Sequence, residues 1–256
     1  MREVRRSSMI DRYSIRRGYR AREVPEYFDD DLGGVVWQPD VYGDAGRIGA
    51  SLGARRIVDV GAGDGTKLAE LHPTFEIVGI DFGANVDRSA NRFPFGSWRH
   101  HDLDTADPLP VADDELDGAV VVCSDVIEHL RTPELLLGKL LATLDHASAV
   151  LISTPERELW HGVRSDGPPR NRHHVREWSI REFGHLMNGA GFKHVSIGLT
   201  RANDRTEEPF TIEALATRSQ EVLGALVPLL IDRPVPAPRH ARIARWIRAG
   251  RILRYG

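Results

Sequence analysis

Residues 57–66 read IVDVGAGDGT, a short apolar run that leads directly into three glycines at alternate positions. The run has the length of a buried strand, and a helix-length segment follows it. Glycine tolerates positive φ and lets a ligand approach the backbone without a Cβ in the way. This junction is typical of the first unit of an open α/β sheet that binds a ligand at its strand ends.

The glycine spacing separates this loop from other ligand-binding loops. A dinucleotide-binding loop follows G-x-G-x-x-G, and its helix N-terminus faces a pyrophosphate. Here the spacing is G-x-G-x-G, and Asp59 lies two residues before the first glycine. A carboxylate at this place suits a cationic or amine-bearing ligand better than a phosphate. Because Lys67 is not in a G-K-[ST] context, the loop is not a P-loop either.

Strand-length apolar runs alternate with helix-length segments from residue 55 to about residue 217. This alternation predicts βαβ units and a mainly parallel sheet. The predicted strands cover residues 57–60, 75–80, 97–101, 118–123, 149–153, 195–199 and 210–216. The predicted helices cover residues 65–71, 85–91 and 133–144, and a fourth is capped by Ser179 and runs to residue 188.

Three further segments flank or interrupt this core of residues 55–217. Residues 1–54 are polar and irregular, and we interpret them as an N-terminal cap segment. Residues 155–178 form an insertion of a length that is usually functional or disordered. Residues 218–256 form a C-terminal tail that ends in the pattern of a basic amphipathic helix. We expect this helix to pack on its own domain or on a second subunit, as in a homodimer, rather than on a membrane surface.

The composition excludes several classes of protein. The formal net charge of the 256 residues is -3, so no global basic field points to nucleic acid. No apolar stretch is long enough for a bilayer span, and the basic start lacks the apolar region of a secretory signal. The single cysteine, Cys123, excludes an internal disulfide and a Cys-rich zinc site. These features predict a soluble, cytoplasmic protein.

Acidic residues follow the second and third predicted strands. Asp81 ends the second strand 20 residues after Gly61, where a carboxylate can accept both hydroxyls of a ribose. Asp102 follows the third strand. An ordered set of three acids, with Asp59 as the first, is not typical of ordinary solvated loop carboxylates.

With these motifs, residues 55–217 resemble the class I S-adenosylmethionine-dependent methyltransferases. The resemblance rests on VDVGAGDGTKL, VGID, HDLDTADPLP, AVVVCSDVIEHL and the distal STP. It implies a Rossmann-like α/β fold, with helices on both faces of a seven-stranded, mostly parallel sheet whose last strand is antiparallel. It also implies S-adenosylmethionine as cofactor. By this resemblance the cofactor-binding residues are Asp59, Gly61, Ala62, Gly63 and Gly65 at the methionine moiety, Asp81 at the ribose with Phe82 beside it, Asp102 and Leu103 at the adenine, and Ser124 near the sulfonium.

An acid–histidine cluster follows the fourth predicted strand, where residues 124–130 read SDVIEHL. If these residues begin a helix, Asp125, Glu128 and His129 lie on one face, at i, i+3 and i+4. That face meets the carboxyl ends of the strands, where open α/β sheets bind ligands. Two carboxylates and an imidazole can hold a divalent cation there, with His174 of the insertion as a further ligand.

This set is similar to the acid-x-x-Glu-His plus distal histidine of two metal-dependent methyltransferase groups. One methylates catechol-type quinone precursors, and the other methylates the terminal ribose of small RNAs. The resemblance implies Mg²⁺ or Mn²⁺ on Asp125, Glu128, His129 and His174, bridging two vicinal oxygens of the acceptor. Those groups have glutamate where this chain has Asp125, so direct coordination, coordination through water and no coordination all stay open.

Two other interpretations of the cluster also stay open. In one, Glu128 and His129 only line the pocket. In the other, a histidine is the general base that accepts the acceptor's proton, because its pKa lies near the operating pH. His129 and His174 are the first candidates for that base, and His173 is the next.

The insertion offers residues for an acceptor, since residues 167–178 read GPPRNRHHVREW. This segment looks like one found in bacterial methyltransferases of glycan and glycolipid pathways. Arginines can form fork contacts to a carboxylate or phosphate, and tryptophans offer flat faces to a sugar ring, although solvated charges and local core are equally common roles. The residues concerned are Arg164, Arg170, Arg172, Arg176, Trp160 and Trp178. Residues 200–206 either reach the acceptor pocket or form an ordinary turn.

Taken together, the sequence favours an enzyme that methylates a hydroxyl of a small sugar-containing acceptor. Metal-free N- or C-methylation of another metabolite is an alternative, and so is a non-catalytic S-adenosylmethionine-binding protein. A nicotinamide-binding oxidoreductase would require the glycine loop to be misread. RNA as acceptor follows from the resemblance, but the net charge of -3 and the lack of an RNA-binding module speak against it.

Overall fold

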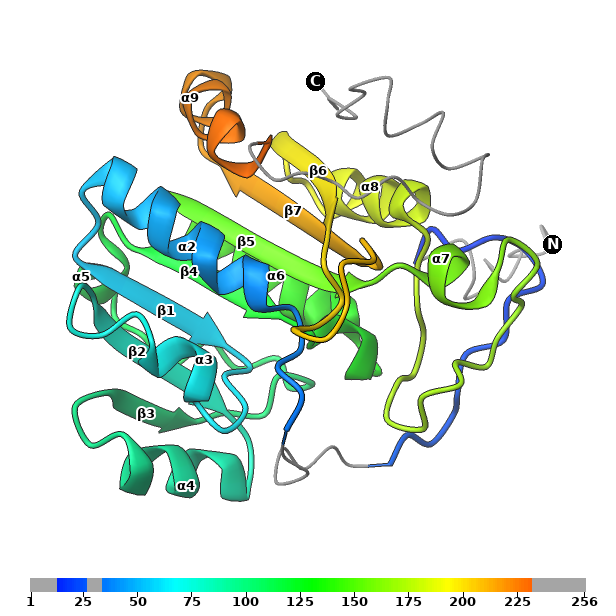
Figure 1. Ribbon diagram of the computed structural model, residues 1–256, viewed down its shortest axis with the longest axis horizontal. Coiled ribbons are helices and arrows are strands. Elements are labelled where there is room, and N and C mark those ends of the chain that lie inside the picture. Colours follow the sequence, from blue (N-terminus) through cyan, green and yellow to red (C-terminus); the bar gives the residue numbers. More distant parts are fainter. Residues whose placement is uncertain (1–12, 27–33, 232–256) are drawn as a thin grey trace, which may run out of the picture.

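The computed structural model describes residues 13–26 and 34–231, and a seven-stranded sheet lies at its centre (Figure 1). The strands are β1 (Arg56–Val60), β2 (Glu76–Asp81), β3 (Ser97–His100), β4 (Val120–Ser124), β5 (Ala149–Pro155), β6 (His194–Thr200) and β7 (Thr211–Thr217). Their order across the sheet is β3-β2-β1-β4-β5-β7-β6. Strands β1 to β5 pair in parallel, whereas β7 runs antiparallel to both β5 and β6. The predicted α/β fold, with its antiparallel last strand, is confirmed.

Helices cover both faces of this sheet (Figure 1). They are α2 (Pro39–Leu52), α3 (Thr66–Ala69), α4 (Ala84–Arg92), α5 (Asp113–Leu116), α6 (Pro133–Thr143), α7 (Arg157–His161), α8 (Ile180–Gly189) and α9 (Gln220–Ile231), with a 3-10 turn, η1 (Ile127–His129), after β4. Helices α2 and α9 pack together on one face, and α6 and α8 lie on the other. Along β1, Ile57 joins the core under α2, whereas Val58 and Val60 join the core on the opposite face. Because apolar side chains occupy both faces, the strands read as continuous apolar runs.

Helix α2 is the largest difference from the prediction, which took residues 1–54 as irregular. Three glycines inside the helix hide it, since each lowers helix propensity by about 1 kcal/mol relative to alanine. Tertiary packing explains one of them, because a Cβ on Gly49 would lie 2.8 Å from the ring of Phe75. The buried face of the helix consists of Val41, Tyr42, Asp44, Ala45, Ile48 and Gly49.

The N-terminal segment 13–26 runs beside the insertion, although about 150 residues separate the two in sequence (Figure 1). Backbone hydrogen bonds join them at Arg20 N to Asp166 O (2.7 Å), Arg22 N to Val175 O (2.7 Å) and Glu26 N to Arg172 O (3.1 Å). The N–H of Glu177 also donates to the hydroxyl of Tyr19 (2.9 Å). The cap segment therefore holds the insertion in place.

The predicted C-terminal tail is described only as far as α9, which packs on α2, β6 and β7. The predicted basic helix within residues 239–256 lies outside the described residues, and the homodimer stays a prediction. In the part of the chain that the structure describes, no helix has both the length and the apolar character needed to cross a bilayer. Cys123 is fully buried in β4, as expected of a small apolar side chain.

Candidate functional site

A cavity of about 980 Å³ opens at the carboxyl ends of β1, β2 and β4. This volume is at the upper end of the range of ligand sites, so it can admit a nucleotide-sized ligand together with a second molecule. The predicted cofactor residues that line it are Gly61, Ala62, Gly63, Asp81, Phe82, Asp102, Leu103 and Ser124. Asp125, His129 and His173 line the same cavity.

The glycine loop is pressed against the turn that follows β4. Gly61 has a φ of 89°, and a Cβ on it would lie 2.3 Å from Cγ2 of Val126. The N–H groups of Gly61 and Ala62 both donate to the carbonyl of Ile80, at 2.7 and 3.0 Å. Both the conformation and the space therefore require glycine at this position, which keeps the loop backbone close to the cavity.

Asp81 is held at the cavity wall by backbone donors. Its carboxylate accepts hydrogen bonds from the N–H of Gly63 (2.7 Å), the N–H of Phe82 (2.6 Å) and the amide of Asn85 (3.3 Å). Burial raises its pKa, although the two backbone hydrogen bonds oppose that shift. The result is a fixed acceptor at the end of β2, where the sequence predicts a ribose partner.

Asp59 and Gly65 lie behind the loop and do not contribute to the cavity wall. The Asp59 carboxylate is fully buried and accepts a hydrogen bond from the hydroxyl of Tyr42 (2.7 Å). Gly65 precedes α3 with a φ of 74°, and a Cβ there would lie 2.4 Å from Cη2 of Trp98. Both residues thus support the loop from behind, and the cofactor contact expected of them from the sequence stays a prediction.

We expect Asp59→Asn to stabilise the protein increasingly as the pH rises. Burial raises the pKa of Asp59 to about 7, against 3.8 for an ordinary aspartate. The folded state therefore binds more protons than the unfolded state between those values, and the stability of the native protein falls as pH rises through this window. From pH 5.5 to pH 8 the gap in unfolding free energy between variant and native protein should widen by about 2 kcal/mol.

Urea unfolding at the two pH values measures this gap. The control is Asp145→Asn at an exposed position, where the gap should not change. A variant that is less stable than the native protein at pH 8 would show that ionised Asp59 stabilises the fold, for example through Lys67.

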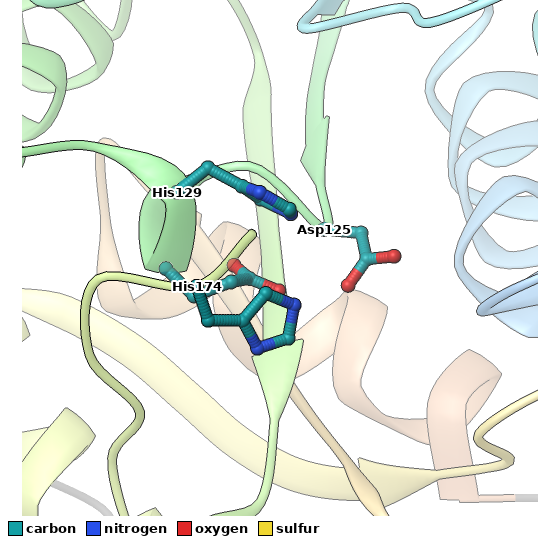
Figure 2. Close-up of side chains that lie close together, drawn as sticks. Asp125, His129 and His174 are labelled. Carbon is teal, nitrogen blue, oxygen red and sulfur yellow. The ribbon is translucent and has the colours of Figure 1, made fainter. Parts of the chain in front are cut away.

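The acid–histidine cluster contains the four predicted residues, but the backbone that carries it differs from the predicted helix. Residues after β4 do not begin an α-helix: Asp125 has a left-handed φ of 62°, and η1 is a single 3-10 turn. The cluster still comes together, because the turn and the insertion bring their side chains to one point (Figure 2). One ligand atom from each of Asp125, Glu128, His129 and His174 lies within 4.8 Å of the others.

Hydrogen bonds fix both imidazoles with the same ring nitrogen turned away from the cluster. Nδ1 of His129 lies 3.1 Å from the carbonyl oxygen of His173. Nδ1 of His174 lies 2.6 Å from Oε1 of Glu177. Since both partners are acceptors, Nδ1 is the donor in each ring. This is the arrangement in which metal-binding histidines are usually held. Nε2 of His174 also lies 2.9 Å from the amide nitrogen of Asn171.

Glu177 is a residue that the sequence did not single out. It bridges His174 and His161, whose Nε2 lies 3.0 Å from its Oε2. Burial alone would raise its pKa, but the hydrogen bonds from the two histidines outweigh burial and lower it to about 2. Glu177 is therefore an ionised, buried carboxylate behind His174.

The pKa values of the two acids of the cluster are shifted in opposite directions. Glu128 is fully buried, and Thr154 donates to its Oε2 (3.0 Å). No hydrogen bond from the described residues reaches its Oε1. Burial and the neighbouring Asp125 raise the pKa of Glu128 well above its usual range. Burial would also raise the pKa of Asp125, but Glu128 and His129 outweigh it and lower that pKa.

These residues fit a divalent cation. Two carboxylates and two imidazoles are an oxygen and nitrogen donor set that suits Mn²⁺ and related ions, and a cation would compensate the second buried negative charge. Burial, and then His174, lower the pKa of His129 to about 4, so the ring is neutral at physiological pH, as a ligand must be.

The insertion is hydrogen-bonded to the backbone of the turn that carries the cluster. The N–H groups of Val175 (2.7 Å) and Arg176 (3.3 Å) donate to the carbonyl of Glu128. The Arg176 guanidinium donates to the carbonyls of Leu130 (3.1 Å) and Arg131 (3.2 Å). Arg176 is thus a buried structural residue rather than the predicted acceptor contact.

The other predicted acceptor residues are placed as follows. Trp178 is fully buried in the core, so it offers no face to a sugar. Arg164, Arg170 and Arg172 are exposed and do not line the cavity. Trp160 is 36% exposed, and its ring centroid lies 6.5 Å from that of Trp37, a cavity residue that the sequence analysis did not consider. Thr200 ends β6 and residues 201–206 form a loop that holds the start of α2, with Arg201 paired to Asp40.

Comparisons with known proteins agree with this architecture. A family described as "Methyltransferase domain" matches residues 17–197. The methyltransferase domain of the bacterial protein CtHen1-C is similar in structure, with a TM-score of 0.52, 23% identity and coverage of 70% of this chain and 97% of that chain. The plantazolicin methyltransferase BamL, solved with a triazolic desmethylPZN analog and SAH, has a TM-score of 0.52, 13% identity and coverage of 70% and 84%. These two likenesses concern the fold, and the curated proteins contain no match.

Proposed function

The chain belongs to the methyltransferase domain family, and from this premise we propose that it is an S-adenosylmethionine-dependent O-methyltransferase. In this proposal the acceptor is a hydroxyl of a small sugar-containing molecule, and a divalent cation assists. The motif resemblance and the fixed carboxylate of Asp81 on the cavity wall support S-adenosylmethionine as methyl donor. The cytoplasmic location belongs to the same proposal.

The observation that carries the proposal is the four-residue cluster beside the cofactor wall. Asp125 and His129 line the same cavity as Ser124 and the glycine loop. A cation on these residues would lower the pKa of an acceptor hydroxyl and fix its oxygen for in-line attack on the methyl group. This chemistry suits an oxygen acceptor with vicinal hydroxyls better than a nitrogen or carbon acceptor.

The chain's own residues supply the positioning. In the proposal the glycine loop holds the methionine part of the donor, Asp81 accepts the ribose hydroxyls, and Asp102 and Leu103 contact the adenine. His129 serves better as a neutral ligand than as a general base, because burial and His174 lower its pKa to about 4 and make it a weak proton acceptor at pH 7.

The space for the acceptor has one aromatic wall. Trp37 lines the cavity and is 41% exposed, and Lys67 donates to its carbonyl (3.2 Å). Its flat face supports a sugar ring as part of the acceptor, a role for which the sequence had suggested Trp160 and Trp178.

One observation favours an alternative without metal. Asp125 and Glu128 can also satisfy each other by sharing a proton, since burial and Asp125 raise the pKa of Glu128. A cluster that is complete without a cation would fit a metal-free N- or C-methyltransferase, or a non-catalytic S-adenosylmethionine-binding protein.

An acceptor screen with labelled S-adenosylmethionine tests the proposal. The panel contains sugars, sugar acids, catechol-type quinone precursors and an RNA oligonucleotide, each with and without chelator. We expect label transfer to a sugar-containing acceptor that stops with chelator and returns with Mg²⁺ or Mn²⁺. His174→Ala should lose this transfer, whereas His185→Ala, at an exposed position of α8, should retain it.

Other outcomes separate the alternatives. Transfer that persists in chelator supports the metal-free enzyme. Binding of S-adenosylhomocysteine without transfer to any acceptor supports the non-catalytic protein. Transfer to the RNA alone contradicts the small acceptor.

A further inference from the structure

Gln38 connects the N-terminal part of the chain to the acid–histidine cluster. It is the residue before α2, has a left-handed φ of 51° and is only 2% exposed. It does not line the cavity, so it has no place in the cofactor or acceptor site described above. A buried glutamine with a left-handed backbone is uncommon as the residue before a helix. The contacts of its side chain should therefore explain its presence there.

The side-chain hydrogen bonds of Gln38 reach the neighbouring strands β4 and β5 and the residue that follows β4. Its Nε2 donates to Oδ1 of Asp125 (2.8 Å). Its Oε1 accepts a hydrogen bond from the hydroxyl of Ser124 (3.2 Å) and also bonds the hydroxyl of Ser153. Because the carboxylate of Asp125 can only accept, the NH₂ group of the amide faces it, and the two hydroxyls lie on the carbonyl side.

We propose that Gln38 is a positioning residue that holds the carboxylate of Asp125 in the orientation required for the cation. This inference rests on the metal-assisted function proposed above. Asp125 is the ligand that most needs such support, because it precedes η1 and its own backbone is left-handed, with a φ of 62°. The hydrogen bond on Oδ1 fixes the plane of the carboxylate, and Oδ2 can serve as the ligand atom.

The backbone around Gln38 is itself held, which makes it a suitable anchor. The N–H of Gln38 donates to the carbonyl of Ala202 (2.9 Å), and the preceding Trp37 pairs with Asn203 in an isolated bridge. On the other side, Asp40 is paired with Arg201 at 2.6 Å. The loop between β6 and β7 thus fixes Gln38, and Gln38 fixes Asp125. The same backbone segment places Trp37 at the cavity. One segment therefore supports both Trp37, the proposed acceptor contact, and Asp125, the proposed cation ligand.

Removing the amide should weaken cation binding without removing a ligand. Gln38→Leu is one atom shorter and cannot donate to Asp125, so the carboxylate gains freedom that cation binding must then restrict. Loss of such an indirect contact typically lowers metal affinity about 10- to 100-fold. We expect a loss of at least about tenfold in Mn²⁺ affinity, while S-adenosylhomocysteine affinity in chelator changes by less than about threefold.

The experiment is calorimetric titration of the full chain with Mn²⁺, and separately with S-adenosylhomocysteine. The matched control is Gln220→Leu, because the sequence contains two glutamines and Gln220 is exposed at the start of α9. Gln38→Met is the second variant, because its flexible side chain fills the same space if leucine does not permit folding. Circular dichroism and thermal unfolding confirm that the compared variants are folded.

The outcomes distinguish this inference from the proposed function. Weaker Mn²⁺ binding in a folded Gln38 variant, with the control unchanged, supports it. Native Mn²⁺ affinity in that variant overturns the role of Gln38 and leaves the metal site intact. A parallel loss of S-adenosylhomocysteine affinity also overturns it, because Gln38 would then act through Ser124. If the native chain does not bind Mn²⁺ at all, the metal-assisted function fails, and this inference fails with it.

Discussion

Glu128→Gln is expected to lower methyl transfer by at least about two orders of magnitude and to abolish its dependence on Mg²⁺ or Mn²⁺. Glutamine keeps the shape of the side chain and can still accept the hydrogen bond from Thr154, but it removes the negative charge. A cation site of this kind is worth several kcal/mol of transition-state stabilisation, and each 1.4 kcal/mol corresponds to about tenfold in rate.

The thermal stability of the same variant, in contrast to its activity, is expected to be unchanged or higher. Glu128 is fully buried, and burial together with Asp125 raises its pKa well above the usual range. A neutral amide avoids the penalty for charge in this place, so Glu128→Gln should unfold at the same temperature as the native protein or at a higher one. A loss of activity in a protein of equal or greater stability cannot be ascribed to misfolding.

The test compares turnover on the acceptor found by the screen, in chelator and with added metal. Glu221→Gln, an exposed change on α9, is the control and should behave as the native protein. Native turnover in Glu128→Gln would leave this residue as a neutral part of the pocket wall and would remove the strongest support for metal assistance.

The regularity of the core explains why its strands could be predicted to within about two residues at each end. β1, β4 and β5 lie in the middle of the sheet and are almost entirely buried, so their apolar runs are continuous in the sequence. The capped start of α8 is also a local signal, since Ser179 and Glu182 form a reciprocal capping box. Local patterns of this kind need no knowledge of the rest of the fold.

Helix α2 shows where such patterns are insufficient. Its glycines are unfavourable for an isolated helix, and the gain comes from packing against residues more distant in sequence, such as Phe75. The sequence of this segment, taken alone, therefore predicted irregular structure, although the folded chain forms a 14-residue helix there.

The candidate site was predictable in part for a similar reason. Asp125, Glu128 and His129 are near neighbours in sequence, so any compact turn brings them together, even though the expected helix is in fact a 3-10 turn. Gln38 reaches the cluster only across the fold, 87 positions before Asp125, and Glu177 binds His174 from the insertion rather than from the turn after β4. No local motif marks such residues, and only the tertiary structure identifies them.

Asp81→Ala is expected to weaken binding of S-adenosylhomocysteine by about 100-fold or more. Hydrogen bonds to a charged acceptor contribute about 1.5 to 3 kcal/mol each, and the proposed role of Asp81 is to accept two ribose hydroxyls. The carboxylate is already held at the end of β2, with backbone donors on both oxygens. The 3.3 Å hydrogen bond from Asn85 is the longest of the three, so it is the one that a ribose hydroxyl can most easily replace.

Calorimetry in the presence of chelator measures this loss without any contribution from the cation site. Asp87→Ala is the control, because Asp87 is an exposed aspartate on the neighbouring helix α4 and should not affect binding. If instead Asp81→Ala binds S-adenosylhomocysteine as the native chain does, the ribose does not lie at the end of β2. The cofactor site would then have to be sought elsewhere on the cavity wall, independently of the outcome for Glu128. The two variants therefore test the two halves of the proposed site separately: one its affinity for the donor and the other its dependence on a metal.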